Sequence, residues 1–287
     1  MVRGLLTVAV LLCAGCSAFD REGRREALFE RAAAQSWRSE TFDAKQFKLL
    51  TIQRRAAPAA ILTVYIEGDG RAWLDRSTPS ANPTPERPVG LRLALSDPST
   101  KVVYIGRPCQ YLSTQDTAKC DVRYWTSHRY APDVVAALSQ AIDRHKTDSG
   151  AVIELIGYSG GGVLATLIAA RRTDVRRIVT IAANLDLSVW TRALGVDSMV
   201  NSLDPASEAD RIEVIAQYHL AGASDEAVPP SVVRSYMAGG TRIGPRRVME
   251  IVPDYDHDCC WHRDWTARIA GIRARLPIAG DSVTPAR

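Results

Sequence analysis

The chain has 287 residues, of which 46% are hydrophobic and 24% charged, and its formal net charge is +4. This composition excludes a disordered or low-complexity protein, because the chain is long and apolar enough to bury a full core. The charge is small and spread out, without a basic tract or an interleaved array of aromatic residues, so nothing indicates nucleic-acid binding.

The first 15 residues have the features of a secretory signal peptide. Arg3 precedes the apolar run 5–12, and small residues follow it before Cys16. The run is too short to be a stable membrane span. We therefore expect residues 1–15 to be removed and the protein to be exported.

The sequence Ala14-Gly15-Cys16 resembles the lipoprotein box of bacteria, in which the cysteine is lipidated and becomes the first mature residue. The resemblance implies a membrane anchor at Cys16. Ser17 then favours the outer membrane, on its periplasmic face, if the source is Gram-negative. Cys13 stands where this box usually has leucine, so secretion without a lipid is the alternative.

Residues 16–40 are predicted to be a tether with a helix in its middle. The segment is rich in alanine and arginine, and Glu22, Glu26 and Glu30 lie at helical spacing among the arginines. We expect a solvated helix that packs on the following domain. The alternative is a helix that lies against anionic lipid headgroups.

Strand-like and helix-like runs alternate from residue 47 to 276, without repeats or a low-complexity linker. This alternation predicts one α/β domain over residues 41–280, followed by a flexible tail over 281–287. The expected strands lie within 42–52 (an edge strand) and at 59–66, 101–105, 151–156, 177–183, 216–223 and 247–252. The expected helices lie at 89–95, 132–146, 162–172 and 261–276.

The most informative motif is Gly157-Tyr158-Ser159-Gly160-Gly161, between the run 151–156 and a helix. Gly157 and Gly161 lack the Cβ atoms that would collide in a sharp strand-to-helix turn. Ser159 would then be held in a strained turn with its hydroxyl pointing outward. We interpret Ser159 as a nucleophile.

This motif is the G-x-S-x-G nucleophile elbow, and the sequence resembles the serine hydrolases of the α/β-hydrolase fold. The resemblance implies a mostly parallel central sheet with helices on both faces. It also implies a catalytic acid and then a histidine, in that chain order, each just after a later strand. The resemblance covers most of the mature chain.

Both partners are present at the implied positions. Asp225 follows the run 216–223 and is the candidate acid, and His257 follows the run 247–252 and is the candidate general base. Asp186, at the end of an earlier strand-like run, is the alternative acid. His262, five positions beyond His257, is the alternative base.

The oxyanion donors follow from the same resemblance. The amide N–H of Gly160, at the start of the helix after Ser159, is the first expected donor. The second is expected in the loop after the strand 59–66, where many relatives have His-Gly and this chain has Glu67-Gly68. We expect the amide of Asp69 there, with Gly70 as the alternative.

Residues 77–88 contain four prolines, which excludes regular structure. This segment is expected to be a loop over the mouth of the site, where it would take part in substrate selection.

Four cysteines remain after Cys13 and Cys16 are set aside, and an even number in an exported protein suggests disulfides. A bridge between Cys109 and Cys120 would close a short loop and stabilise the protein by roughly 3 kcal/mol. Cys259 and Cys260 are adjacent, so they form a bridge with each other, remain thiols or pair with the earlier two. The spacing lacks a C-x-x-C element, which argues against a metal site.

The predicted activity is transfer of an acyl group to water through an acyl-Ser159 intermediate, with no metal or organic cofactor. A carboxylesterase-like serine hydrolase acting on a small-molecule or acylated substrate is the first expectation. An envelope peptidase or thioesterase on the same residues is the alternative, and a catalytically silent binding lipoprotein is the alternative from another class.

Overall fold

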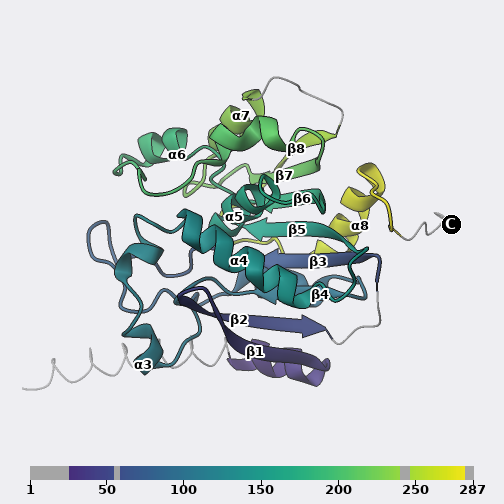
Figure 1. Ribbon diagram of the computed structural model, residues 1–287. Coiled ribbons are helices and arrows are strands. Elements are labelled where there is room, and N and C mark those ends of the chain that lie inside the picture. Colours follow the sequence, from purple (N-terminus) through teal and green to yellow (C-terminus); the bar gives the residue numbers. More distant parts are fainter. Residues whose placement is uncertain (1–25, 55–58, 240–245, 282–287) are drawn as a thin grey trace, which may run out of the picture.

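The computed structural model describes residues 26–54, 59–239 and 246–281, which form one eight-stranded sheet with helices on both faces (Figure 1). The predicted signal peptide, Cys16 and residues 282–287 of the predicted tail lie outside the described residues. Asp281, the first residue of the predicted tail, is described and pairs with Arg177. The strand order is β1-β2-β4-β3-β5-β6-β7-β8. The strands are β1 Trp37–Ala44, β2 Phe47–Arg54, β3 Ile61–Ile66, β4 Val102–Ile105, β5 Val152–Tyr158, β6 Val175–Ile181, β7 Ala216–Gly222 and β8 Arg247–Val252.

The strands β3 to β8 run parallel, whereas β1 pairs antiparallel with β2 and β2 pairs antiparallel with β4. The carboxyl ends of β3 to β8 therefore lie along one edge of the sheet, which we call the carboxyl edge. In folds of this kind the loops that leave this edge carry the functional groups.

A helical segment over residues 26–34 precedes β1, and the other helices connect the strands. They are α2 Val89–Ser96, α3 Thr114–Thr117, α4 Pro132–His145, α5 Gly160–Ala169, α6 Leu187–Leu194, α7 Pro230–Ala238 and α8 Trp265–Arg275, with the 3₁₀ helices η1 Val122–Trp125 and η2 Pro205–Ile212. The predicted central strands and main helices are thus present, with boundaries displaced by a few residues.

The outermost strands on one side of the sheet, β1 and β2, differ from the expectation. Instead of one strand within 42–52, the chain forms the hairpin β1–β2, which turns at Lys45, a residue with a φ of 55°. Ala44 and Phe47 face each other across the turn, and both are buried. The middle of β1 is mostly polar and partly exposed, so it carries too little apolar signal to be recognised in the sequence.

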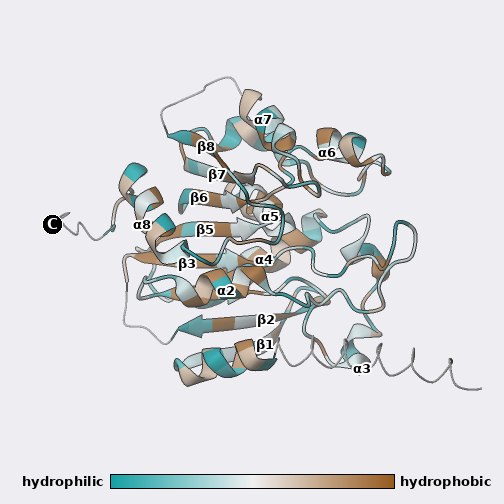
Figure 2. Ribbon diagram, turned by 180° about the vertical axis from the view of Figure 1, so that it is seen from behind, coloured by the Kyte–Doolittle hydropathy of each residue, from teal (hydrophilic) through white to brown (hydrophobic). Residues whose placement is uncertain are grey.

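Two apolar layers hold the helices to the sheet. Alternate residues of β3 point to opposite faces: Leu62 and Val64 pack in the layer under α4 and α5, and Tyr65 packs in the layer under α2 and α8. Figure 2 shows α2 and α8 on the face opposite to that of α4 in Figure 1. Helix α5 is buried along its whole length, as expected of the helix that follows the nucleophile turn.

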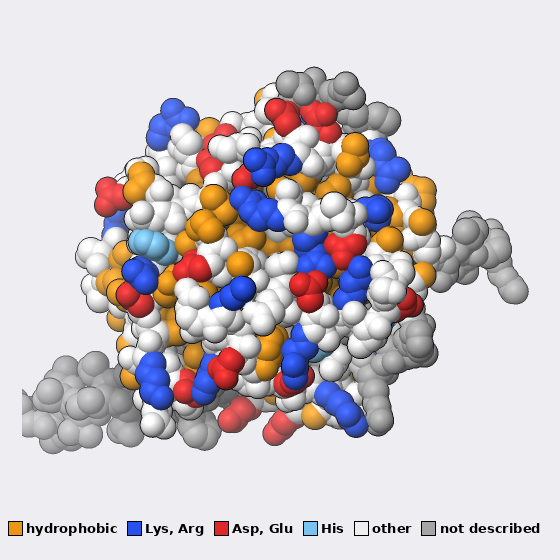
Figure 3. Space-filling view, viewed as in Figure 1, with side chains coloured by type: hydrophobic (Ala, Val, Ile, Leu, Met, Phe, Trp, Pro, Cys, Tyr) orange, Lys and Arg blue, Asp and Glu red, His pale blue; other side chains and the backbone are white. Residues whose placement is uncertain are grey.

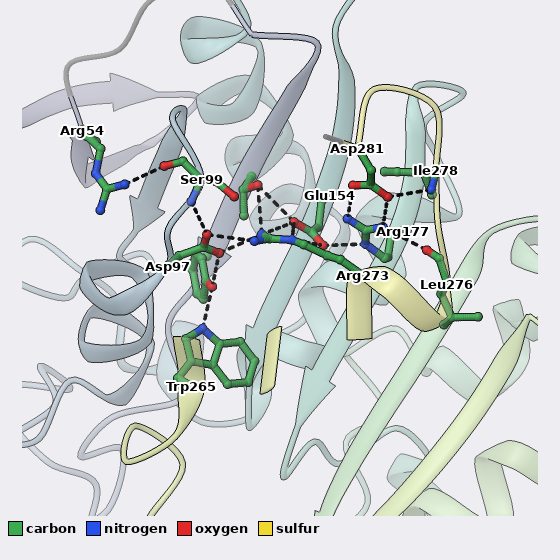
Figure 4. A network of polar contacts seen from close by, with 12 residues as sticks. Arg54, Asp97, Ser99, Glu154, Arg177, Trp265, Arg273, Leu276, Ile278 and Asp281 are labelled. Atoms are coloured by element: carbon green, nitrogen blue, oxygen red, sulfur yellow. Dashed lines mark hydrogen bonds and ion pairs between the residues drawn. The ribbon is translucent and has the colours of Figure 1, made fainter. Parts of the chain in front are cut away.

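A buried ionic network fixes α8 to the sheet (Figure 4). Glu154 of β5 is fully buried between two arginines. Arg177 of β6 donates from Nε to Glu154 Oε1 over 2.6 Å, and Arg273 of α8 donates from Nη2 to Oε2 over 2.5 Å. Arg273 and Arg177 also pair with Asp97 and Asp281, at 2.8 Å each. The carboxyl-terminal helix is therefore anchored at the middle of the sheet.

Cys109 and Cys120 form the predicted disulfide, with their Cα atoms 5.9 Å apart. Cys259 and Cys260 are bridged to each other, which is one of the pairings that the sequence left open. The first bridge lies in the segment between β4 and α4, and the second lies two residues after His257. Both bridges thus occur in segments that leave the carboxyl edge.

The face that carries α4 and α5 shows basic and acidic side chains mixed together, without a large area of one sign (Figure 3). None of the helices in the described part of the chain is both long and apolar enough to cross a membrane.

Candidate active site

Ser159 stands in the sharp turn between β5 and α5. Its backbone has a φ of 51° and a ψ of −126°, a conformation that L-residues rarely adopt. Gly157 makes the turn possible, because a Cβ at that position would overlap the carbonyl of Gly161. The predicted nucleophile therefore sits in the strained strand-to-helix turn that its flanking glycines suggested.

His257 links Ser159 to Asp225. The Nε2 atom of His257 lies 3.1 Å from Ser159 Oγ, and its Nδ1 atom lies 2.9 Å from Asp225 Oδ2. The three residues follow β5, β7 and β8, so they come together at the carboxyl edge although up to 98 positions separate them in the chain. This arrangement is that of a nucleophile, a general base and an orienting acid.

The acid and the base are both held by further hydrogen bonds. Asp225 is buried, and its Oδ1 atom accepts from the amide of Val228 over 2.7 Å. The backbone carbonyl of His257 accepts from Tyr158 Oη over 3.1 Å and from Trp261 Nε1 over 3.0 Å. Because the loop around His257 is tied at these points, the imidazole has a defined position between its two partners.

The two alternatives from the sequence lie elsewhere. Asp186 caps the amino terminus of α6 by accepting from the amide of Val189 over 2.9 Å, and it also accepts from the hydroxyl of Ser235 over 2.6 Å. His262 is exposed. The structure thus brings together Ser159, Asp225 and His257, and it gives Asp186 a structural contact instead.

Asp69 and Gly160, the two residues predicted to donate to an oxyanion, are neighbours beside Ser159. A Cβ on Gly160 would overlap the Asp69 carboxylate, so only glycine fits between this side chain and the nucleophile turn. Within the described residues, no acceptor takes the amide N–H of either residue. Both amides are available for a bound group.

The side chain of Asp69 is part of a buried ionic cluster that the sequence did not indicate. Asp69 Oδ1 pairs with Arg107 Nη1, and Asp69 Oδ2 accepts from Arg129 Nη1 over 2.7 Å and from Tyr130 Oη over 2.9 Å. Burial raises the pKa of Asp69, but the two guanidinium groups outweigh this effect and hold the pKa well below its usual range. Asp69 is therefore ionised at any pH at which the protein would function.

Glu67 has a structural role in the loop that precedes Asp69. Its buried carboxylate accepts from the amides of Gly90 at 3.1 Å and Leu91 at 3.3 Å, in the first turn of α2, and from Tyr104 Oη at 2.9 Å. Burial raises the pKa of this carboxyl group, although these hydrogen bonds oppose the shift. Glu67 thus connects the loop of Asp69 to the start of α2.

The segment rich in proline forms an irregular loop next to α6, as its composition predicted. The start of the segment, at Thr78 and Pro79, contacts the residues just before it. Pro79 forms an isolated bridge with Trp73, and the carbonyl of Thr78 accepts from the amide of Leu74 over 2.8 Å. Arg76 Nη2 lies 3.4 Å from the carbonyl of Leu194 at the end of α6. The loop therefore has defined contacts along the carboxyl edge.

Comparison with solved structures gives the same architecture. An esterase of Pyrococcus furiosus superposes with a TM-score of 0.60 and 12% sequence identity, over 84% of this chain and 91% of the esterase. A serine hydrolase without a lid from Xanthomonas campestris superposes with a TM-score of 0.52 and 16% identity, over 87% and 97% of the two chains. The chain has the α/β-hydrolase fold. No protein-family model and no curated protein matches its sequence.

The α/β-hydrolase fold predicted from the motif is thus confirmed. The solved structures that resemble this chain include serine hydrolases, as the motif also predicted. An acylaminoacyl peptidase of Pyrococcus horikoshii is also similar, with a TM-score of 0.60 and 10% identity over 88% of this chain and 43% of the peptidase. Within the described part of the α/β-hydrolase domain, no group of three or more His, Cys, Asp or Glu side chains is arranged to hold a metal ion.

Arg107, Arg129 and Tyr130 are the residues near the site that sequence reasoning missed. Arg107 follows β4 by two positions, and a charged residue directly after a buried parallel strand is a signal that could have been used. Arg129 and Tyr130 lie in an aromatic segment 60 residues from Asp69, and nothing local connects them with the nucleophile loop.

Proposed function

We propose that the chain is a serine hydrolase that cleaves an acyl bond of ester type through an acyl-Ser159 intermediate. The observation that carries the proposal is the continuous hydrogen-bond path from Ser159 Oγ through His257 to Asp225. The position of Ser159 at the start of a buried helix supports it, since the amides there can stabilise negative charge.

In the acylation step, Ser159 Oγ attacks the carbonyl carbon of the substrate and gives its proton to His257 Nε2. The carbonyl oxygen becomes an oxyanion, which accepts from the amides of Gly160 and Asp69. Asp225 accepts a hydrogen bond from the Nδ1–H group of His257 and so stabilises the imidazolium, which keeps both of its protons. When the tetrahedral intermediate collapses, the bond to the leaving group breaks and His257 returns the proton to the departing alcohol.

Deacylation repeats the sequence with water as the nucleophile. His257 takes a proton from water as its oxygen attacks the acyl carbon, and the second tetrahedral intermediate uses the same two amides. Collapse breaks the bond to Ser159, which receives the proton from His257, and a carboxylic acid is released. The steps use only these residues and water.

A carboxylic ester is the first substrate class to test, since it is the broadest for this set of residues. The similarity to an acylaminoacyl peptidase makes an amide substrate the second class. A thioester is the third. A panel of esters, thioesters and acylated peptides distinguishes these classes by their kcat/KM values.

The deciding experiment is labelling of the mature, oxidised protein with a fluorophosphonate. We expect the wild type to be labelled, and Ser159→Ala and His257→Ala to be unlabelled, because the probe requires an activated serine. The matched control is His262→Ala, which removes an exposed imidazole from the same segment and should leave labelling intact. A wild type that is folded by circular dichroism but unlabelled would reject the proposal in favour of a silent binding lipoprotein.

The same proposal places the enzyme on a membrane through a lipid on Cys16. The sequence Ala14-Gly15-Cys16 supports an anchor. The path of the chain is consistent with it: Phe29 lies 5.6 Å from Tyr111, which follows β4, whereas Trp37 pairs with Arg54 at the opposite edge. The helical segment 26–34 therefore begins near the carboxyl edge, where a tether from Cys16 would join the domain.

A further inference from the structure

Two guanidinium groups share one carboxylate beside the nucleophile turn. Arg107 and Arg129 both pair with Asp69, and in the described residues neither arginine pairs with another carboxylate. Arg107 and Arg129 are 3% and 8% exposed. The cluster thus carries one surplus positive charge in a place where little water can screen it, and a buried charge without a partner of opposite sign is costly.

The cluster is also rigid. Arg107 Nη2 donates to the carbonyl of Arg129 over 2.7 Å, and Arg129 Nε donates to the carbonyl of Thr126 over 2.8 Å. Tyr130 Oη donates to Asp69 and receives a hydrogen bond from Asn184 Nδ2 over 3.1 Å. Segments that follow β3, β4 and β6 are therefore joined at one carboxylate, and the loop of Asp69 cannot move independently of them.

The positive charge of the cluster lies next to Gly160, the residue that follows the nucleophile. The position that a Cβ of Gly160 would occupy lies 2.7 Å from Arg107 Nη1, and the Asp69 carboxylate overlaps the same position. The carboxylate alone would oppose negative charge at the amide of Gly160. With both arginines in place, the local balance is positive instead.

We propose that Arg107 and Arg129 are positioning residues that, by holding and neutralising the Asp69 carboxylate, fix the amides of Asp69 and Gly160 for the oxyanion and favour its charge. This role rests on the proposed serine hydrolase function. It acts on the transition state and not on the substrate, because the oxyanion exists only after attack by Ser159.

The test is Arg107→Met, assayed with p-nitrophenyl acetate and with a trifluoromethyl ketone that forms a hemiketal oxyanion on serine. Active sites are counted by fluorophosphonate titration, so that misfolded protein does not contribute. We expect kcat to fall by about tenfold to a hundredfold, with the ketone affinity falling by the same factor, and KM to change by less than about threefold. A purely structural arginine would lower stability and leave kcat per active site and the ketone affinity unchanged.

Arg107→Lys keeps the charge but replaces the two guanidinium nitrogens that donate separately to Asp69 and to the carbonyl of Arg129 with a single ammonium nitrogen. We expect a smaller loss, about threefold to tenfold, in kcat and in ketone affinity. If Arg107→Met does not fold, Arg107→Lys is measured in its place. Wild-type values for Arg107→Lys would overturn the proposal.

The matched control is Asp97→Asn. Asp97 is as buried as Arg107 and pairs with Arg273, but it lies between α2 and the start of β4, away from the carboxyl edge. The Asp97→Asn variant should be less stable than the wild type, with the same kcat per active site and the same ketone affinity. Equal losses of kcat in Asp97→Asn and Arg107→Met would reject a specific role for the cluster. An unlabelled wild type would instead reject the proposed function, and this inference with it.

Discussion

His219 shows how a single buried side chain links stability to pH. It lies in the middle of β7, fully buried, with Nδ1 at 2.8 Å from Thr180 Oγ1. Burial, and then the charge of Arg247, lower the pKa of His219 to about 3. The ordinary pKa in the unfolded chain is about 6.5, so between these values only the unfolded state binds the proton.

We therefore predict that the free energy of unfolding falls as the pH drops from 7 to 5, with His219 contributing about 2 kcal/mol of the loss. In His219→Asn this contribution disappears, whatever the variant's stability at pH 7. Urea unfolding of both proteins at the two pH values measures the difference. Parallel pH dependences would show that His219 is not buried in its neutral form.

At the scale of secondary structure, strand β5 contains a buried carboxylate, Glu154, that pairs with arginines from two neighbouring elements. Glu154 interrupts an apolar strand, and a lone carboxylate there would be very unfavourable. Arg177 from β6 and Arg273 from α8 compensate it from both sides (Figure 4). This ionic network fixes α8 in one position on the sheet.

We predict that Glu154→Gln lowers the free energy of unfolding by about 3–5 kcal/mol, because two buried arginines lose their shared partner. Chemical denaturation measures this change. The rate of fluorophosphonate labelling should stay at the wild-type value, since Glu154 lies near the start of β5 and Ser159 follows its end. As a control, Glu40→Gln removes the partly exposed pair with Arg144 and should change stability little.

At the scale of the whole molecule, the exposed apolar side chains are unevenly placed. The described residues have six large hydrophobic side chains that are well exposed, and Val214 alone precedes the start of a strand. The others follow the carboxyl ends of β3, β4 and β6: Trp73, Leu74, Val122, Val196 and Val200. If Cys16 carries a lipid, Glu26 is ten positions further along the chain and lies at most about 35 Å from it.

We predict that the anchored enzyme turns its carboxyl edge toward the bilayer, with Trp73 in contact with lipid. Vesicles containing brominated lipid should quench tryptophan fluorescence of the full lipidated chain. Trp73→Phe should remove most of that quenching, because Trp73 is the most exposed tryptophan, Trp190 is partly buried and the other four are buried. Quenching that is unchanged in Trp73→Phe would contradict this orientation. Vesicle association that survives Cys16→Ser would contradict the anchor.

Local patterns determined the fold and the residues of the candidate site. Gly157, Ser159 and Gly161 specify a turn by steric limits within five residues, and the apolar runs specify the parallel strands around it. Because parallel strands place their carboxyl ends at one edge, Asp225 and His257 could be predicted from the strands that they follow.

Other features were decided only by the tertiary structure. The sequence favours His257 over His262, but only the fold shows which imidazole reaches Ser159. The pairing of Asp69 with Arg107 and Arg129 joins segments that are 38 and 60 residues apart. The β1–β2 hairpin is likewise fixed by pairing and by the burial of Ala44 and Phe47. The physical reason is common to all three: ion pairs, hydrogen bonds and packing depend on distance in space, whereas turns and strand patterns depend on neighbours in the chain.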